Sequence, residues 1–64
     1  MKRIIRLPAV EAKTGLKHSE IYQRIKDGLF PKQVPLGTKA VGWLEHEVDQ
    51  WIDQLAAKKL RIAL

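Results

Sequence analysis

Residues 14–28 have the sequence TGLKHSEIYQRIKDG, in which two glycines bracket a short helical pattern. Gly15 is typical of the residue that follows a helix, and Gly28 is placed to end the next one. Ile21 and Ile25 are four residues apart, so they share one face of a helix over residues 18–27. This stretch therefore predicts a helix, a three-residue turn that contains glycine, and a second helix.

The sequence before Gly15 predicts a short strand and the first of these helices. Residues 4–7 (IIRL) form a β-branched run that Pro8 ends. Proline fits the first turn of a helix, because its missing N–H needs no partner there. We therefore expect a strand or extended segment at residues 4–7 and a helix over residues 8–14.

After Gly28 the pattern changes to extended segments. Pro31 and Pro35 exclude a continuous helix. Residues 34–36 and 41–44 are short extended pieces on either side of residues 37–39 (GTK). This arrangement predicts a β-hairpin with a basic tip.

The last part of the chain predicts an amphipathic helix over about residues 45–59. Its apolar residues recur at positions i, i+3, i+4 and i+7, namely Val48, Trp51, Ile52 and Leu55. Acidic residues occupy its first turn and basic residues its end, as the helix dipole favours. We expect Trp43 and Trp51 to belong to the core, since they occupy inward positions of the hairpin and of this helix.

Size, composition and charge narrow the function. A chain of 64 residues has room for one domain, here residues 1–64, and for a small core. It has no cysteine, and its longest apolar runs fall far short of a membrane span. Residues 1–42 carry nine basic and three acidic side chains, whereas residues 43–64 have a net charge of −1. A basic segment beside a nearly neutral one favours a polyanionic partner. We expect a cytoplasmic protein, since the sequence shows neither a membrane span nor a signal peptide.

The second helix has one face without carboxylates. At about 100° per residue, Ile21, Ile25 and Gly28 form its buried stripe. A continuous arc beside this stripe holds Ser19, Tyr22, Gln23 and Lys26. The opposite arc holds Glu20, Arg24 and Asp27, with Glu20 and Arg24 spaced to form an ion pair.

A face of this kind suits the major groove of double-stranded DNA. Carboxylates there would be repelled by the phosphates, whereas glutamine can hydrogen-bond adenine in a bidentate manner. An ordinary solvated face is the alternative, since a helix of ten residues with two acids often has such a gap.

Between about Arg3 and Ile52 the chain carries a set of characteristic segments: residues 5–8 (IRLP), 14–16 (TGL), 21–28 (IYQRIKDG), 30–31 (FP), 41–45 (VGWLE), 47–48 (EV) and 51–52 (WI). In these segments the chain resembles the AlpA family of prophage-associated transcriptional regulators. The family is related to excisionases and to the DNA-binding domain of MerR-type proteins. The resemblance implies a mainly α fold with a small β-hairpin, a winged helix-turn-helix.

In that fold the recognition helix would be residues 18–27, in the major groove, and the wing would be residues 32–41, on the backbone or minor groove. The family commonly has serine where this chain has Lys17. Because lysine cannot accept a backbone N–H, Ser19 could take over the cap and start the helix later. Ser19 would then be structural, and the turn would gain a positive charge.

The candidate DNA-binding residues are the exposed basic and polar side chains of the turn, the second helix and the wing. They are Lys17, His18, Ser19, Tyr22, Gln23, Lys26, Lys32 and Lys39. Tyr22 could contact DNA or be a partly buried aromatic. His18 and His46 are too far apart in sequence to suggest a metal site, and no catalytic set is evident, so we expect no metal, cofactor, small-molecule substrate or enzymatic activity.

The sequence leaves open the biological role of the chain and the way in which copies of it contact one another. An excisionase-like role in bending DNA is an alternative to transcriptional regulation, and a small protein-interaction or inhibitor module is the alternative from another class. One small module buries little surface on DNA, so we expect neighbouring copies on repeated sites. Residues 56–64, with Leu60, Ile62 and Leu64, are the candidate contact between copies, or else a fraying helix end.

Overall fold

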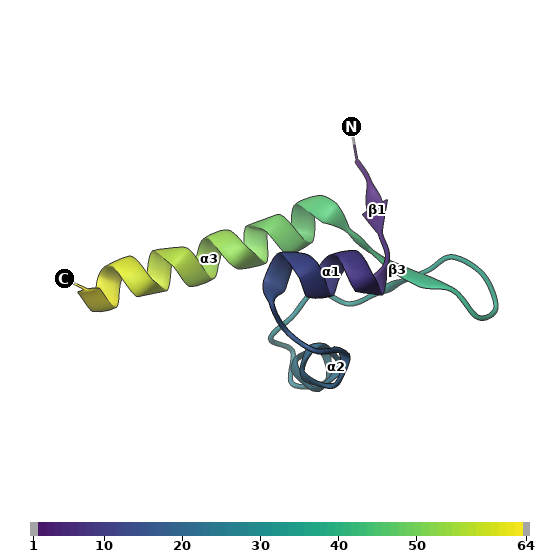
Figure 1. Cartoon of the computed structure of the whole chain (residues 1–64), viewed down its shortest axis with the longest axis horizontal. Helices are drawn as coiled ribbons and strands as arrows, with labels where there is room; N and C mark the ends of the chain where they lie inside the picture. The colour runs from purple at the N-terminus through teal and green to yellow at the C-terminus, as the bar shows by residue number, and fades with distance from the viewer. Residues whose placement is uncertain (1, 64) are drawn as a thin grey trace.

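The computed structural model describes the backbone of residues 2–63 and the side chains of residues 2–59. Figure 1 shows how the helices are arranged around a small sheet. The order is β1 (Ile4–Ile5), α1 (Leu7–Thr14), α2 (His18–Lys26), β2 (Val34–Pro35), β3 (Val41–Leu44) and α3 (Glu45–Ala63). The predicted mainly α architecture with a β-hairpin is confirmed.

The hairpin belongs to a three-stranded antiparallel sheet in the order β1-β3-β2. Strand β1 pairs with β3 through Ile4–Leu44 and Ile5–Trp43, and β2 pairs with β3 through Val34–Gly42 and Pro35–Val41. The short N-terminal strand thus covers the second edge of β3, a pairing that the sequence did not predict.

The helix bounds differ slightly from the prediction. Helix α1 begins at Leu7, with Pro8 in its first turn, and Gly15 follows it at φ 74°. Helix α2 ends at Lys26, so Asp27 lies in the turn. Helix α3 starts directly after β3 and runs to Ala63, four residues beyond the predicted end.

Among residues 2–59, six buried side chains form the core, and no element supplies more than one of them. They are Ile5, Val10, Ile21, Phe30, Trp43 and Val48, from β1, α1, α2, the loop after α2, β3 and α3 respectively. The predicted core position of Trp43 is confirmed, since this side chain is fully buried. Trp51 is half-buried and packs against this core. Gly28, in contrast, was wrongly assigned to the buried stripe of α2, since it is exposed in the turn.

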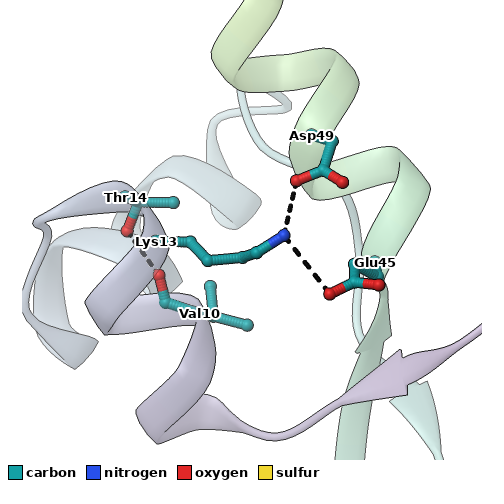
Figure 2. A network of polar contacts seen from close by, with 5 residues as sticks. All are labelled: Val10, Lys13, Thr14, Glu45 and Asp49. Atoms are coloured by element: carbon teal, nitrogen blue, oxygen red, sulfur yellow. Dashed lines mark hydrogen bonds and ion pairs between the residues drawn. The ribbon is translucent and has the colours of Figure 1, made fainter.

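An ion-pair network joins α1 to α3 (Figure 2). The Lys13 ammonium donates a hydrogen bond of 2.6 Å to Asp49 and lies 3.3 Å from Glu45. The bond to Asp49 raises the pKa of Lys13 above its ordinary value of 10.5, partial burial opposes this rise, and Glu45 adds to it. One lysine of α1 thereby pairs with two carboxylates of the first turns of α3.

The C-terminal half of α3 extends away from the other elements (Figure 1). Along its apolar stripe Val48 is buried, Trp51 and Ile52 are half-buried, and Leu55 is 45% exposed. Residues 53–59 are all exposed. The helix is about 28 Å long at 1.5 Å per residue, which is longer than the surface it packs on.

Candidate nucleic-acid interface

The N-terminus of α2 is held by a carboxylate, not by a cap side chain. Lys17 is the N-cap residue, and its side chain caps nothing. Instead its backbone N–H donates to Oε1 of Glu20 at 3.2 Å, which is the reverse half of a capping box. The expectation that Ser19 takes over the cap is therefore wrong: the helix begins at His18, and Ser19 is an exposed residue of its first turn.

The predicted ion pair between Glu20 and Arg24 is also wrong. The Glu20 carboxylate lies toward Lys17, and the Arg24 guanidinium donates to the backbone carbonyl of Glu20 at 3.3 Å. Within residues 2–59, both ion pairs belong to Lys13. The carboxylate of Glu20 thus accepts a backbone N–H and pairs with no cation among the described side chains.

The C-terminus of α2 ends in a Schellman motif. Gly28 adopts φ 75°, its N–H donates to Ile25 O, and the N–H of Leu29 donates to Arg24 O. Glycine is favoured here because L side chains rarely adopt a positive φ. The motif turns the chain sharply into the loop that leads to β2.

Both tryptophans anchor that loop. The indole N–H of Trp51 donates to Leu29 O at 2.7 Å, and that of Trp43 donates to Pro31 O at 3.1 Å. Between these carbonyls, Phe30 is buried with its ring edge-on to Trp51 at 4.8 Å. The C-terminal end of α2 is thereby fixed to β3 and α3, so the outer face of α2 has a defined orientation.

All eight candidate residues are exposed. Six lie on α2 and its N-cap, and these are Lys17, His18, Ser19, Tyr22, Gln23 and Lys26. The other two lie apart from them: Lys32 is in the segment between α2 and β2, and Lys39 is in the loop between β2 and β3. Figure 1 shows this last loop projecting beyond the sheet, at the other end of the molecule from the C-terminus.

The four lysines among these residues are not neutralised by neighbouring carboxylates. Lys17, Lys26, Lys32 and Lys39 form no ion pair within 4.0 Å in the described part of the chain. The turn, α2 and the hairpin loop therefore present net positive charge to solvent.

Tyr22 is both packed and accessible. Its ring lies 6.1 Å from that of Trp43 at an interplanar angle of 58°, yet 38% of the residue is exposed. Tyr22 is thus a partly buried aromatic that packs on Trp43 and is still accessible for a contact with DNA.

Gln23 has a neighbour that the helical arc placed on the other face. Its amide Nε2 lies 3.4 Å and 3.3 Å from the two carboxylate oxygens of Asp27. The face therefore has no carboxylate among its own residues, which are Ser19, Tyr22, Gln23 and Lys26. At its edge, however, Gln23 contacts the carboxylate of Asp27.

Other kinds of site find little support among the described residues. No group of three His, Asp or Glu side chains there could hold a metal ion. A hollow of about 340 Å³ lies between the loop after α2 and α3, lined by apolar side chains together with Glu47, Gln50 and Gln54. Within residues 2–63, no helix is both long enough and apolar enough to cross a membrane.

Comparison with known proteins places the chain in a family. Residues 3–57 match the family described as Prophage CP4-57 regulatory protein (AlpA). The chain is 47% identical, over 58 residues, to the DNA-binding transcriptional activator AlpA of Escherichia coli (strain K12). This alignment covers 81% of the chain and 83% of that relative. The chain belongs to the AlpA family. The expected resemblance is thereby confirmed.

A second relative of the chain comes from a phage. It is the uncharacterized protein ORF88 of Enterobacteria phage P4, 44% identical over 59 residues. The alignment covers 91% of the chain and 67% of ORF88. The AlpA-type sequence thus occurs in a bacterial and in a phage relative.

Proposed function

We propose that the chain is a prophage-type transcriptional regulator that binds double-stranded DNA in a sequence-specific manner, and that it is not an enzyme. The observation that supports this most strongly is its 47% identity to a protein named as a DNA-binding transcriptional activator. Its net charge of +5 agrees with a polyanionic partner, as do the four candidate lysines, which form no ion pair with any described side chain. Such a regulator would act in the cytoplasm.

We propose further that α2 is the recognition helix of a winged helix-turn-helix. An α-helix with its side chains is about 10–12 Å wide, which matches the roughly 12 Å width of the major groove. Gln23 would contact a base edge, and Lys17 and Lys26 would contact phosphates. His18, Ser19 and Tyr22 complete the exposed face that would lie in the groove.

The β2–β3 hairpin would act as the wing. Lys39 lies in its exposed loop and Lys32 precedes β2, so the two lysines could contact phosphates outside the groove that α2 occupies. Contacts of this kind set the orientation of a protein on DNA without reading sequence.

We also propose that copies of the chain bind side by side on repeated sites. A single small module buries about 600–1,000 Å² on DNA, which is little for a tight specific complex. The projecting half of α3 exposes Leu55 on the stripe that is buried at Val48, and is therefore available to a neighbouring copy. The side chains of Leu60, Ile62 and Leu64, which we also expect at this contact, lie outside the described residues.

Selection of bound sequences from random duplex DNA tests binding, specificity and repeat spacing together. We expect one recurrent motif, present in two or more copies at fixed spacing. Recovery of no motif would contradict sequence-specific binding, and recovery of isolated single motifs would contradict side-by-side binding.

Salt dependence tests the predicted phosphate contacts. With about five such contacts, affinity for the selected duplex should fall roughly 10²–10³-fold between 50 and 200 mM salt. A flat response would contradict the basic surface as the binding face.

A promoter reporter tests the regulatory role. A promoter that carries the selected motif should change its output when the chain is expressed, and Lys26→Ala together with Lys39→Ala should abolish the change. An unchanged reporter combined with altered prophage excision would favour the excisionase-like role instead.

A further inference from the structure

Gln23 and Asp27 form the one hydrogen bond between two side chains on the described surface of α2 and its C-terminal turn. The amide nitrogen faces both carboxylate oxygens, at 3.4 Å and 3.3 Å, and both residues are exposed. These distances are long for a hydrogen bond, so in water the contact is weak. The backbone N–H of Asp27 also donates to Gln23 O, which fixes the spacing of the two side chains.

The carboxylate selects one of two orientations of the amide. A glutamine side chain has a donor end and an acceptor end of nearly the same shape, and a free one can present either end. An ionised carboxylate only accepts hydrogen bonds. The Nε2 end is therefore attracted to Asp27, whereas the flipped amide would place Oε1 against two negative oxygens.

The nearby cations do not compete for Asp27. Lys26 forms no ion pair in the described part of the chain, and Arg24 donates to the carbonyl of Glu20. The hydrogen bond should strengthen when DNA displaces water from the helix, because the local dielectric falls.

We propose that Asp27 is a positioning residue for base recognition: it holds the Gln23 amide so that Oε1 and the second N–H of Nε2 face the base edge. This inference rests on the proposed entry of α2 into the major groove. An acceptor and a donor in fixed order match the N6 donor and N7 acceptor of adenine. Asp27 would thus give the chain a preference for adenine at one position without touching the base itself.

The test first finds the base pair at which Gln23→Ala removes the base preference of the chain. It then measures the affinity for the selected duplex and for the three duplexes that carry another base pair at that position. The wild-type chain should discriminate against the wrong bases by roughly 5-fold to 150-fold there. Asp27→Ala should reduce this discrimination to less than about 3-fold, while discrimination at the other positions persists. Asp27→Glu retains a carboxylate and should restore most of the preference.

Two controls separate positioning from other effects. Asp53→Ala removes the same charge from an exposed residue of α3, so it should raise affinity for all sequences slightly and leave base preference unchanged. In a Gln23→Ala background, Asp27→Ala should have no further effect on base preference. Circular dichroism of each variant verifies that it is folded.

Two results would overturn the inference while leaving the proposed function intact. One is full discrimination by Asp27→Ala, which would show that Gln23 needs no orientation. The other is a loss of preference at a different base pair on Asp27→Ala in the Gln23→Ala background, which would show that Asp27 contacts a base directly. A wild-type chain with no base preference at any position would instead overturn the proposed function, and this inference with it.

Discussion

Gly42 lies in the central strand of the sheet, where there is no room for a side chain. A Cβ at this position would lie 2.5 Å from Cγ2 of Ile4 and 3.0 Å from Ile5 O, both in β1. Cγ2 of a β-branched residue is attached close to the backbone and cannot move away alone. The position therefore requires glycine for close approach, not for an unusual backbone angle.

We expect Gly42→Ala to destabilise the domain by about 1–3 kcal/mol, the usual effect of overpacking. Urea unfolding followed by circular dichroism measures the change. Gly37→Ala is the matched control, since a Cβ there meets nothing within 4 Å. Equal stability of the two variants would mean that β1 does not lie against β3 as described.

Lys13 makes the stability of the domain depend on alkaline pH. Its pKa is raised in the folded state by Asp49 and, to a smaller extent, by Glu45. The folded chain therefore holds this proton more tightly than the unfolded chain does. The resulting stabilisation is complete below the ordinary pKa of 10.5 and is lost as pH rises through the higher folded value.

The difference in thermal midpoint between the wild-type chain and Lys13→Met should accordingly be largest at pH 8–9 and shrink above pH 10.5. Thermal unfolding across this range measures it, and Lys58→Met, which removes an exposed lysine of α3, should show no such trend. A difference that is constant with pH would contradict the ion pairs in Figure 2.

Among the elements, α2 has an imperfect N-terminus. Lys17 cannot accept a hydrogen bond from the first turn, and Glu20 supplies only the reverse contact. The side chain that would cap the helix is thus replaced by a cation. If α2 binds DNA, this replacement lowers helix stability and adds a charge near the phosphates.

Lys17→Ser should therefore have opposite effects on folding and on binding. A serine cap should stabilise the domain by about 0.5–2 kcal/mol, measured by urea unfolding. The loss of one phosphate contact should reduce the slope of log affinity against log salt by about 1. Weaker folding together with an unchanged salt slope would contradict both roles.

The elements that could be predicted are those with strong local signals. Gly15, Gly28 and the proline positions marked the ends of α1, α2 and the hairpin, because turns and caps depend on neighbouring residues. The pairing of β1 with β3 could not be predicted. A strand of two residues is too short for its sequence pattern to define a register, and its partner is about 40 residues away.

Side-chain partners were harder to predict than helix bounds. The grouping of α2 residues into arcs favoured a pair between Glu20 and Arg24 and put Gln23 and Asp27 on different faces, although both pairs are four residues apart and can therefore meet. In the structure the carboxylate of Glu20 binds the helix N-terminus, and that of Asp27 contacts Gln23. Competition between a backbone donor and a side-chain donor depends on local geometry, which a helical arc does not contain. The link from Lys13 to α3 likewise needed the tertiary structure.

For the molecule as a whole, the small core leaves little reserve of stability. A domain of this length has roughly 3–10 kcal/mol in total. Within the described side chains the core has six buried members, each from a different segment, so every element depends on its neighbours for burial. Trp51 extends this core by packing on Phe30 and bonding Leu29 O.

Trp51→Ala should lower the free energy of unfolding by about 3 kcal/mol, the lower end for truncation of a core aromatic and a large share of the total for this domain. Circular dichroism with urea measures this loss. Leu55→Ala, one turn further along the same stripe, removes a side chain that is 45% exposed and should cost far less. A folded Trp51→Ala chain that only loses DNA binding would mean that Trp51 contacts DNA.

The central proposal is that α2 lies in the major groove of DNA. It is tested most directly by the affinity of the chain for its selected duplex with 7-deazapurine substituted at one purine at a time. This change removes the N7 acceptor of the major groove and leaves the phosphates and minor groove intact. We predict a loss of roughly 5-fold to 150-fold at one adenine, and no loss at that adenine for Gln23→Ala. Unchanged affinity at every substituted purine would contradict the proposal.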